Sequence, residues 1–192
     1  MNLWFRLFWY LVFHSWRRKL DLPEQTSKLN FRVWPLDLDT SVHLNNGRYL
    51  TLMDQGRLDL MVGGGLVGAV VSKGWTPITN AIIVRFRREL RLFEKLQVQT
   101  RILGWSENEI VLEQLIVSRS GDRKGQVAAR ALFTGGLYDR KARKFVPVSR
   151  MMHEIGVDQD SPQLPEEAKA FFESIERLRD LDRPAKRETV DH

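Results

Sequence analysis

The chain has 192 residues, of which 43% are hydrophobic and 28% are charged, as is typical of a folded globular protein with one core. Its formal net charge of +6 favours acidic partners such as phosphates, anionic lipids or nucleic acid. The absence of cysteine excludes a disulfide framework, a cysteine nucleophile and a thiolate metal site.

The first segment, residues 1–24, is rich in apolar and aromatic side chains. Its apolar run, residues 3–13, is shorter than the roughly 20 residues that a membrane-spanning helix needs. Apart from Arg6 inside the run, its basic residues follow the run, whereas those of a signal peptide precede it. We expect a helix that packs on the protein or lies in a membrane interface, and the sequence leaves these two alternatives open. The expected location is cytoplasmic, with peripheral membrane contact in the second case.

A strand, a loop and a long helix are predicted next. Residues 23–28 are typical of a linker, residues 29–34 alternate as in a strand, and residues 37–46 are irregular and polar. A helical pattern follows and ends in the glycines at positions 63–65, with a short helix predicted at residues 66–72.

The long helix has one apolar face, formed by Tyr49, Met53, Gly56 and Leu60. A glycine inside a helix costs about 1 kcal/mol relative to alanine. Gly56 on the apolar face therefore predicts that another backbone passes very close to the helix.

Four strands are predicted after the helices, at residues 78–88, 96–105, 109–117 and 127–138. Short links join antiparallel neighbours, so we expect a meander of four strands with the long helix lying across the concave face of the sheet. A last helix begins near Pro165 and ends before Pro184, and the final residues are expected to be disordered. Its predicted apolar stripe comprises Ala168, Phe171, Ile175 and Leu178.

The loop before the long helix concentrates polar chemistry. Residues 37–49 read DLDTSVHLNNGRY, which places two carboxylates, an imidazole and two amides directly before a helix N-terminus. Such an end presents unpaired N–H groups and partial positive charge, which polarise an acyl carbonyl, and a nearby carboxylate can act as nucleophile or general base. Helix caps and Asx-turns use the same residue types, so composition alone favours a structural role.

The spacing of these residues adds a resemblance to a known family. The string DLDxxxHxNNxxYL over residues 37–50 resembles the signature of hotdog acyl-CoA thioesterases of the 4-hydroxybenzoyl-CoA thioesterase superfamily. The similarity extends over residues 31–147, and WPLDLD and RILGW particularly resemble the thioesterase superfamily member six subgroup. The resemblance implies an α+β hotdog fold at residues 25–148, an antiparallel sheet wrapped around the long helix, with helical extensions at residues 1–24 and 149–192.

The resemblance also implies roles by position. Asp39 matches the catalytic carboxylate, and Asn46 or Gly47 would supply the backbone N–H that polarises the thioester carbonyl. His43 matches a loop histidine that either hydrogen-bonds near the site or holds the shape of the loop. Asp37 matches a position that is more often structural.

Further residues are candidates for the same site. Asn45, Gly47, Tyr49 and Arg88 are expected to bind substrate. Asp54 is the second candidate for the base, because another hotdog branch places its carboxylate on the central helix.

The implied activity is hydrolysis of acyl-CoA or acyl carrier protein thioesters in fatty acid metabolism. Coenzyme A is then part of the substrate, and no cofactor is expected. The family's sites lie between subunits, which implies a homodimer or a tetramer of dimers. Candidate partners for the phosphates of coenzyme A are Arg85, Arg87, Arg88, Arg123 and Lys124.

Two other classes of function are considered. The first is a hotdog protein that binds acyl chains or lipids at a membrane surface without hydrolysing them. The second, nucleic-acid binding through residues 85–91, lacks a recognised motif, so no nucleic-acid partner is expected. A metal site is not expected either, because His14, His43, His153 and His192 show no ligand spacing.

Overall fold

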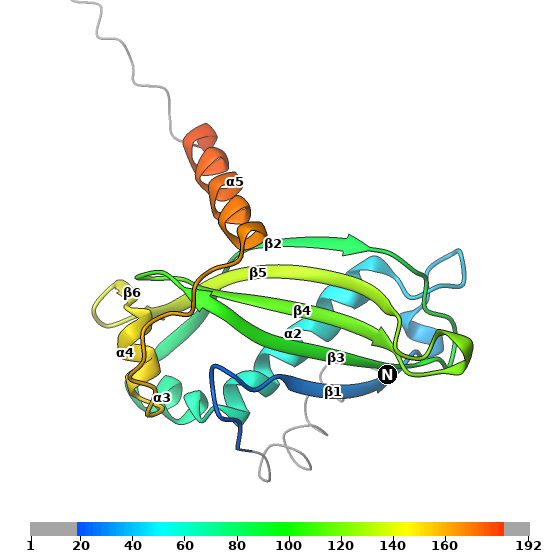
Figure 1. Cartoon of the computed structure of the whole chain (residues 1–192), viewed down its shortest axis with the longest axis horizontal. Helices are drawn as coiled ribbons and strands as arrows, with labels where there is room; N and C mark the ends of the chain where they lie inside the picture. Colours follow the sequence, from blue (N-terminus) through cyan, green and yellow to red (C-terminus); the bar gives the residue numbers. More distant parts are fainter. Residues whose placement is uncertain (1–18, 183–192) are drawn as a thin grey trace, which may run out of the picture.

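The structure, a computed structural model, describes residues 19–182. Within them, a six-stranded antiparallel sheet curls around the long helix α2 (Asn46–Gly63), as Figure 1 shows. This is the predicted α+β arrangement. The strands are β1 (Ser27–Arg32), β2 (Trp75–Phe86), β3 (Lys95–Trp105), β4 (Ile110–Ser118), β5 (Val127–Asp139) and β6 (Lys144–Val146). The other helices are α3 (Leu66–Lys73), α4 (Val148–His153) and α5 (Glu166–Asp182), with 3-10 turns at Pro35–Asp37 and Gly121–Arg123.

The strand order corrects one prediction. The sheet runs β1-β3-β4-β5-β2, with β6 beside β5. The meander is therefore right for β3, β4 and β5 but wrong for β2, which pairs with β5 instead of β3. The link between β2 and β3 spans residues 87–94, longer than the two to five residues of an ordinary hairpin loop, so it can cross from the edge strand β2 to β3, which lies next to the opposite edge of the curled sheet.

The apolar face predicted for α2 is the face that is buried in the structure. Tyr49, Met53 and Leu60 are buried, as predicted. Gly56 is closely approached, as predicted, but the groups that approach it are side chains of the sheet and not the expected backbone. A Cβ at Gly56 would lie 2.6 Å from Thr100 Oγ1 and 2.8 Å from Val98 Cγ1, both on β3.

A buried polar side chain fixes this packing in place. The Gln114 amide group on β4 donates to the Met53 carbonyl of α2 at 2.8 Å and to Thr100 Oγ1 at 3.0 Å. The Gln114 carbonyl oxygen accepts from Arg57 Nη1 at 2.6 Å. Because these groups are buried, leaving one unpaired would cost about 1–3 kcal/mol, so the network holds the middle of α2 against one place on the sheet.

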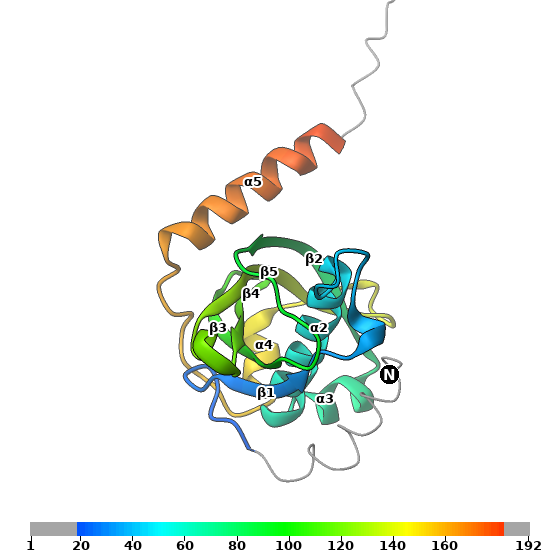
Figure 2. The ribbon, with the colours of Figure 1, turned by 90° about the vertical axis from the view of Figure 1, so that its right-hand side faces the viewer.

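The two ends of the chain agree only partly with the predictions. Residues 19–24 contain a turn at residues 22–24 and no helix, and residues 1–18 lie outside the described part. Ala168, Phe171 and Ile175 of α5 are buried as predicted, whereas Leu178 is exposed because the helix runs away from the sheet (Figures 1 and 2). The predicted helix end at Pro184 and the disordered tail also fall outside the described residues. In residues 19–182, no helix has the length and apolarity needed to cross a membrane.

The packing at Gly56 yields a stability prediction. Gly56→Ala should lower the free energy of unfolding by about 1–3 kcal/mol in urea titrations, because the clash with Thr100 and Val98 outweighs the better helix propensity of alanine. The matched control is Gly68→Ala in α3, where a Cβ would meet nothing within 4 Å and should stabilise the protein slightly. Equal effects of the two substitutions would contradict the close-packing account.

Candidate functional site

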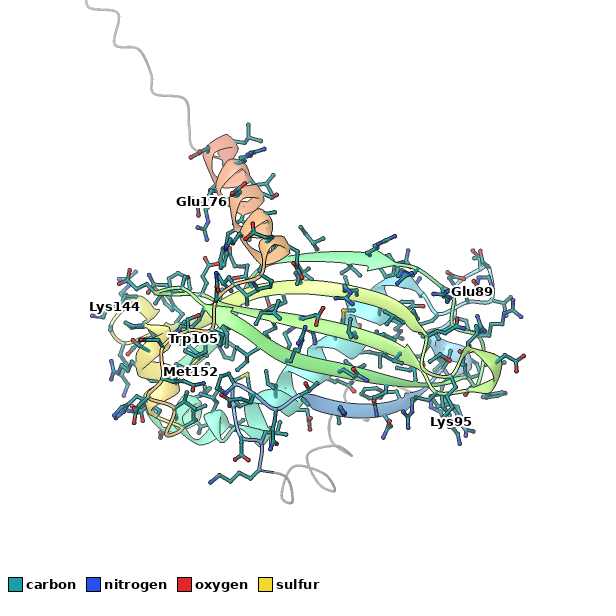
Figure 3. All side chains as sticks on the ribbon, viewed as in Figure 1. Glu89, Lys95, Trp105, Lys144, Met152 and Glu176 are labelled. Atoms are coloured by element: carbon teal, nitrogen blue, oxygen red, sulfur yellow. The ribbon has the colours of Figure 1, made fainter. Side chains whose placement is uncertain are left out.

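A hollow of about 320 Å³ lies at the N-terminal end of α2. It is formed where the loop before α2 meets the end of β2 and the link that follows it. Figure 3 labels Glu89, which marks this end of the molecule. The hollow is lined by Asp39, Ser41, His43, Leu44, Asn46, Tyr49, Phe86, Arg87, Arg88 and Glu89. It therefore brings together five of the predicted site residues, Asp39, His43, Asn46, Tyr49 and Arg88.

Asp39 is half-buried in a tight turn that fixes its carboxylate. Its Oδ1 accepts from the backbone N–H of Ser41 at 2.9 Å and of His43 at 3.3 Å. Its backbone N–H donates to the His43 carbonyl at 2.9 Å, which closes the turn. No hydrogen bond to Asp39 Oδ2 occurs in the described part of the chain, so one oxygen anchors the carboxylate and the other is available for chemistry.

His43 holds the loop through its backbone. Besides its two bonds to Asp39, it forms an isolated antiparallel bridge with Arg91 of the β2–β3 link. His43 lines the hollow, and its imidazole makes no hydrogen bond within residues 19–182. The backbone thus performs the loop-shaping role, and the ring remains free to meet a ligand.

Asp37, in contrast, is enclosed in the loop. Its Oδ2 accepts from the Trp34 N–H at 3.0 Å, and Arg48 Nε lies 3.8 Å from its Oδ1. Its backbone carbonyl accepts from the Asn45 N–H at 2.9 Å. Asp37 does not line the hollow, and these contacts fit the structural position that the sequence match suggested.

The first turn of α2 has one uncommitted backbone donor. Asn45 is the N-cap, and its Oδ1 accepts from the Gly47 N–H at 2.8 Å. The N–H groups of Arg48 and Tyr49 donate to the Asn45 carbonyl at 2.8 and 3.3 Å. Among the described residues, nothing accepts from the Asn46 N–H. Of the two donors named from the sequence, Gly47 is therefore used by the cap and Asn46 is available, at the positive end of the helix dipole.

Tyr49 joins α2 to the β2–β3 link. Its ring packs edge-on against Phe86, with centroids 5.2 Å apart, and its hydroxyl donates to the Arg88 carbonyl at 3.2 Å. Burial, assisted by the negative charge of Glu94, raises the pKa of Tyr49 to about 12. The hydroxyl therefore remains a hydrogen-bond donor at neutral pH. Arg88 is held here through its backbone, and its side chain is exposed.

Asp54 is not part of this hollow. It lies eight residues beyond Asn46, about 12 Å along the helix axis, and is paired with Arg57. Both residues border a second cavity of about 190 Å³ between α2 and the sheet. The lining of this cavity is mainly apolar, with Leu60, Ile102 and Phe133 among its members.

Phe86, Arg87 and Glu89 belong to the site but were not predicted as a group. They reach it because the β2–β3 link crosses the end of α2, where the Leu90 carbonyl accepts from the Leu44 N–H at 2.8 Å. The crossing depends on β2 pairing with β5, so no local pattern in the sequence could reveal it.

A family profile described as thioesterase-like superfamily matches residues 33–170. The chain belongs to this superfamily. The match covers the loop that carries Asp39, the central helix and the whole sheet except β1.

Protein THEM6 from Xenopus laevis is 37% identical to the chain over 90 residues, and Protein THEM6 from Drosophila melanogaster is 27% identical over 141 residues. The first match covers 47% of this chain and 44% of the frog protein, and the second covers 73% and 68%. The chain thus spans less than half the length of the frog relative. These likenesses confirm the resemblance to thioesterase superfamily member six.

Solved structures confirm the hotdog fold. The probable thioesterase YbaW from Escherichia coli superposes with a TM-score of 0.61 at 23% identity, over 69% of this chain and 97% of that protein. SAV2348 from Staphylococcus aureus, solved in complex with CoA, has a TM-score of 0.61 at 14% identity, over 78% and 96% of the two chains.

The raised pKa of Tyr49 predicts a pH dependence of stability. Below pH 10.0 the tyrosine is protonated in both the folded and the unfolded chain, so its contribution to the free energy of unfolding is fully present. Between pH 10.0 and about 12 the unfolded chain ionises first, and this contribution is lost. In urea titrations across this window, the free energy of unfolding should fall more steeply for wild type than for Tyr49→Phe. Parallel curves for the two proteins would show that Tyr49 is not buried as described.

Proposed function

We propose that the chain hydrolyses acyl thioesters of coenzyme A or of acyl carrier protein in the hollow at the start of α2. One observation carries the proposal. The Asp39 carboxylate, fixed through one oxygen, lines the same hollow as Asn46, whose backbone N–H is available at the helix N-terminus. Membership of a thioesterase-like superfamily supports this choice of reaction.

The proposed mechanism uses these two groups in sequence. The thioester carbonyl oxygen accepts from the Asn46 N–H, and the partial positive charge of α2 stabilises the oxyanion that develops there. Asp39 Oδ2 either attacks the carbonyl carbon or removes a proton from the attacking water. On the base route, the hydroxide left by the water adds to the carbonyl carbon, the carbon–sulfur bond breaks, and the proton held by Asp39 passes to the thiolate, so that the free acid and thiol leave. On the nucleophile route, the carbon–sulfur bond breaks to leave a mixed anhydride with Asp39, and the thiolate takes a proton from solvent. A water molecule then hydrolyses the anhydride, which releases the free acid and restores the carboxylate.

Charge near the hollow suits a coenzyme A substrate. Arg87 and Arg88 line the hollow, are exposed and form no ion pair in the described chain, so both can meet phosphates. Arg123, also named from the sequence, is already paired with Glu89 and Glu94 and is less suited to this role.

The second cavity suits the acyl part of the substrate. It begins near Asp54, about 12 Å beyond Asn46 along the same helix, and its lining is mainly apolar. An acyl group that enters it would lose contact with water, which favours binding in proportion to the apolar area buried.

A homodimer is part of the proposal. In residues 19–182, β2 has a strand on only one side, and its exposed edge carries Ile78, Ile83 and Phe86. A long apolar edge strand left in water invites pairing with another strand. Pairing of β2 with its copy about a two-fold axis would cover this edge and close the side of the site that β2 forms.

Removal of the Asp39 charge is the direct test of the site. Asp39→Asn preserves the oxygen that accepts from Ser41 and His43, so the loop should keep its shape. We predict a loss of kcat of about 10²–10⁴-fold for acyl-CoA hydrolysis, followed as thiol release with a thiol-reactive dye. Full activity of Asp39→Asn would contradict the assignment.

Two further carboxylates sharpen this test. Asp122→Asn changes an exposed carboxylate in the turn Gly121–Arg123 and serves as the matched control, with activity near that of wild type. Asp54→Asn decides between the two candidate bases, because a loss as large as that of Asp39→Asn would transfer the base role to the helix.

Dimerisation through β2 predicts a monomeric variant. Ile83→Lys should shift the sedimentation velocity from dimer to monomer and lower thiol release, because it places a charge on the apolar edge. Val71→Lys, at an exposed apolar position on α3 and outside β2, is the control. An Ile83→Lys protein that remains dimeric would place the interface elsewhere.

A further inference from the structure

The end of the molecule that faces the viewer in Figure 2 carries a group of exposed apolar side chains. We name it the loop-end patch, and it comprises Trp34, Leu36, Val42, Leu92 and Phe93. The exposed fractions are 70% for Leu36, 61% for Val42 and 52% for Phe93. Contiguous exposed apolar patches mark sites of interaction with proteins, membranes or ligands, whereas single exposed apolar residues are ordinary.

The loops that carry the patch are bound to each other, so the side chains form one surface. The Phe93 N–H donates to the Val33 carbonyl at 2.9 Å, and the rings of Trp34 and Phe93 meet edge-on with centroids 6.0 Å apart. Arg48 of α2 donates to the Leu36 carbonyl at 3.2 Å, which ties the other side of the patch to the central helix.

Two members of the patch adopt a backbone conformation that is unfavourable for their residue types. Val42 has a φ of 61° and Phe93 a φ of 62°, in the left-handed region that glycine and asparagine occupy at lower cost. A β-branched residue in this region is unusual. Retaining apolar side chains at strained and exposed positions is understandable if those side chains contact an apolar phase.

Uncompensated cations border the patch. Arg32 and Lys95 are opposite each other in the pairing of β1 with β3, and both are exposed without an ion pair in residues 19–182. Like charges directly opposite on adjacent strands are unfavourable, so this pair suits an anionic partner. Among the carboxylates near the patch, Glu89 pairs with Arg91 and Arg123, and Glu94 is buried against Arg123. Asp39 and Asp122 form no ion pair in the described residues, but the exposed and likewise unpaired cations at this end, Arg32, Arg87, Arg88 and Lys95, outnumber them.

We propose that the loop-end patch docks on an anionic lipid bilayer. Aromatic and aliphatic side chains enter the interface between headgroups and acyl chains, and Arg32 and Lys95 meet the lipid phosphates. Binding to an anionic protein would explain the exposed cations. It would not explain why apolar side chains are retained at the strained positions of the two loops. The residues of this patch are not those of the N-terminal segment, whose sequence leaves a helix in a membrane interface as one of two alternatives.

Docking in this way would place the hollow at the membrane surface. Val42 lies in the turn between Asp39 and His43, both of which line the hollow. A substrate with a long acyl chain is dissolved in the bilayer and would meet the site without crossing water. The docking itself does not require hydrolysis, so its test and the test of the proposed function can fail independently.

The absence of native cysteine makes a site-specific test possible. A single cysteine introduced by Leu36→Cys takes an environment-sensitive fluorophore in the patch, and Val71→Cys, at a position 75% exposed on α3, takes the same fluorophore as the control. Each labelled full-length protein is mixed with vesicles of phosphatidylcholine alone or of phosphatidylcholine with phosphatidylserine. We expect a blue shift at position 36 with the anionic vesicles and none at position 71.

A second variant tests the charge. Because each cation near an anionic surface contributes about a fivefold gain in binding, Arg32→Gln combined with Lys95→Gln should weaken the response at position 36 by tenfold or more.

Three results would overturn the proposal. The first is sedimentation with vesicles while the fluorophore at position 36 still reports water, which would assign membrane binding to another segment. The second is an equal shift on neutral vesicles, which would remove the role of the cations. The third is a shift without vesicles that grows with protein concentration, which would identify a second copy of the chain as the occupant.

Discussion

The central helix lies so close to the sheet that only a hydrogen atom fits at position 56, and the Gln114 side chain fixes the helix at that point. Gln114 bonds the backbone of Met53 on one side and the Thr100 hydroxyl on the other, so the helix cannot slide along the sheet without leaving buried polar groups unpaired. The N-terminus of α2 is therefore set relative to the ends of the strands. The distances between the first turn of α2 and the β2–β3 link, such as that from the Tyr49 hydroxyl to the Arg88 carbonyl, depend on that placement.

The site itself depends on two loops that are joined by backbone hydrogen bonds. The loop before α2 and the β2–β3 link meet at Leu44 and Leu90, at His43 and Arg91, and again at Val33 and Phe93. These bonds hold Asp39 and Asn46 around one hollow while Tyr49 connects the helix to the link. The same joined loops carry the loop-end patch, so the surface proposed to meet lipid and the carboxylate proposed to act on the thioester belong to one hydrogen-bonded unit.

Local patterns in the sequence predicted what depends on neighbours along the chain. Apolar periodicity located α2 and the buried face of α5, and the spacing from Asp37 to Leu50 located the loop and the cap. Two features could not be predicted from local patterns, because they depend on residues that are distant in sequence. The pairing of β2 with β5 decides that Phe86 and Arg87 line the hollow, and the Gln114 network decides what lies against Gly56. The prediction that Leu178 is buried failed because an amphipathic stripe does not reveal where a helix leaves the body it packs on.

The central claim is that this hollow cleaves thioesters, and thiol release by the unmodified full-length protein tests it most directly. The protein would be offered acyl-CoAs of increasing chain length, with folding checked by circular dichroism and assembly by sedimentation. We predict release above the uncatalysed rate, with a maximum at the chain length that the apolar cavity beside α2 accommodates best. A folded, dimeric protein that binds these acyl-CoAs and releases no thiol from any of them would contradict the account and favour a protein that carries acyl groups without cleaving them.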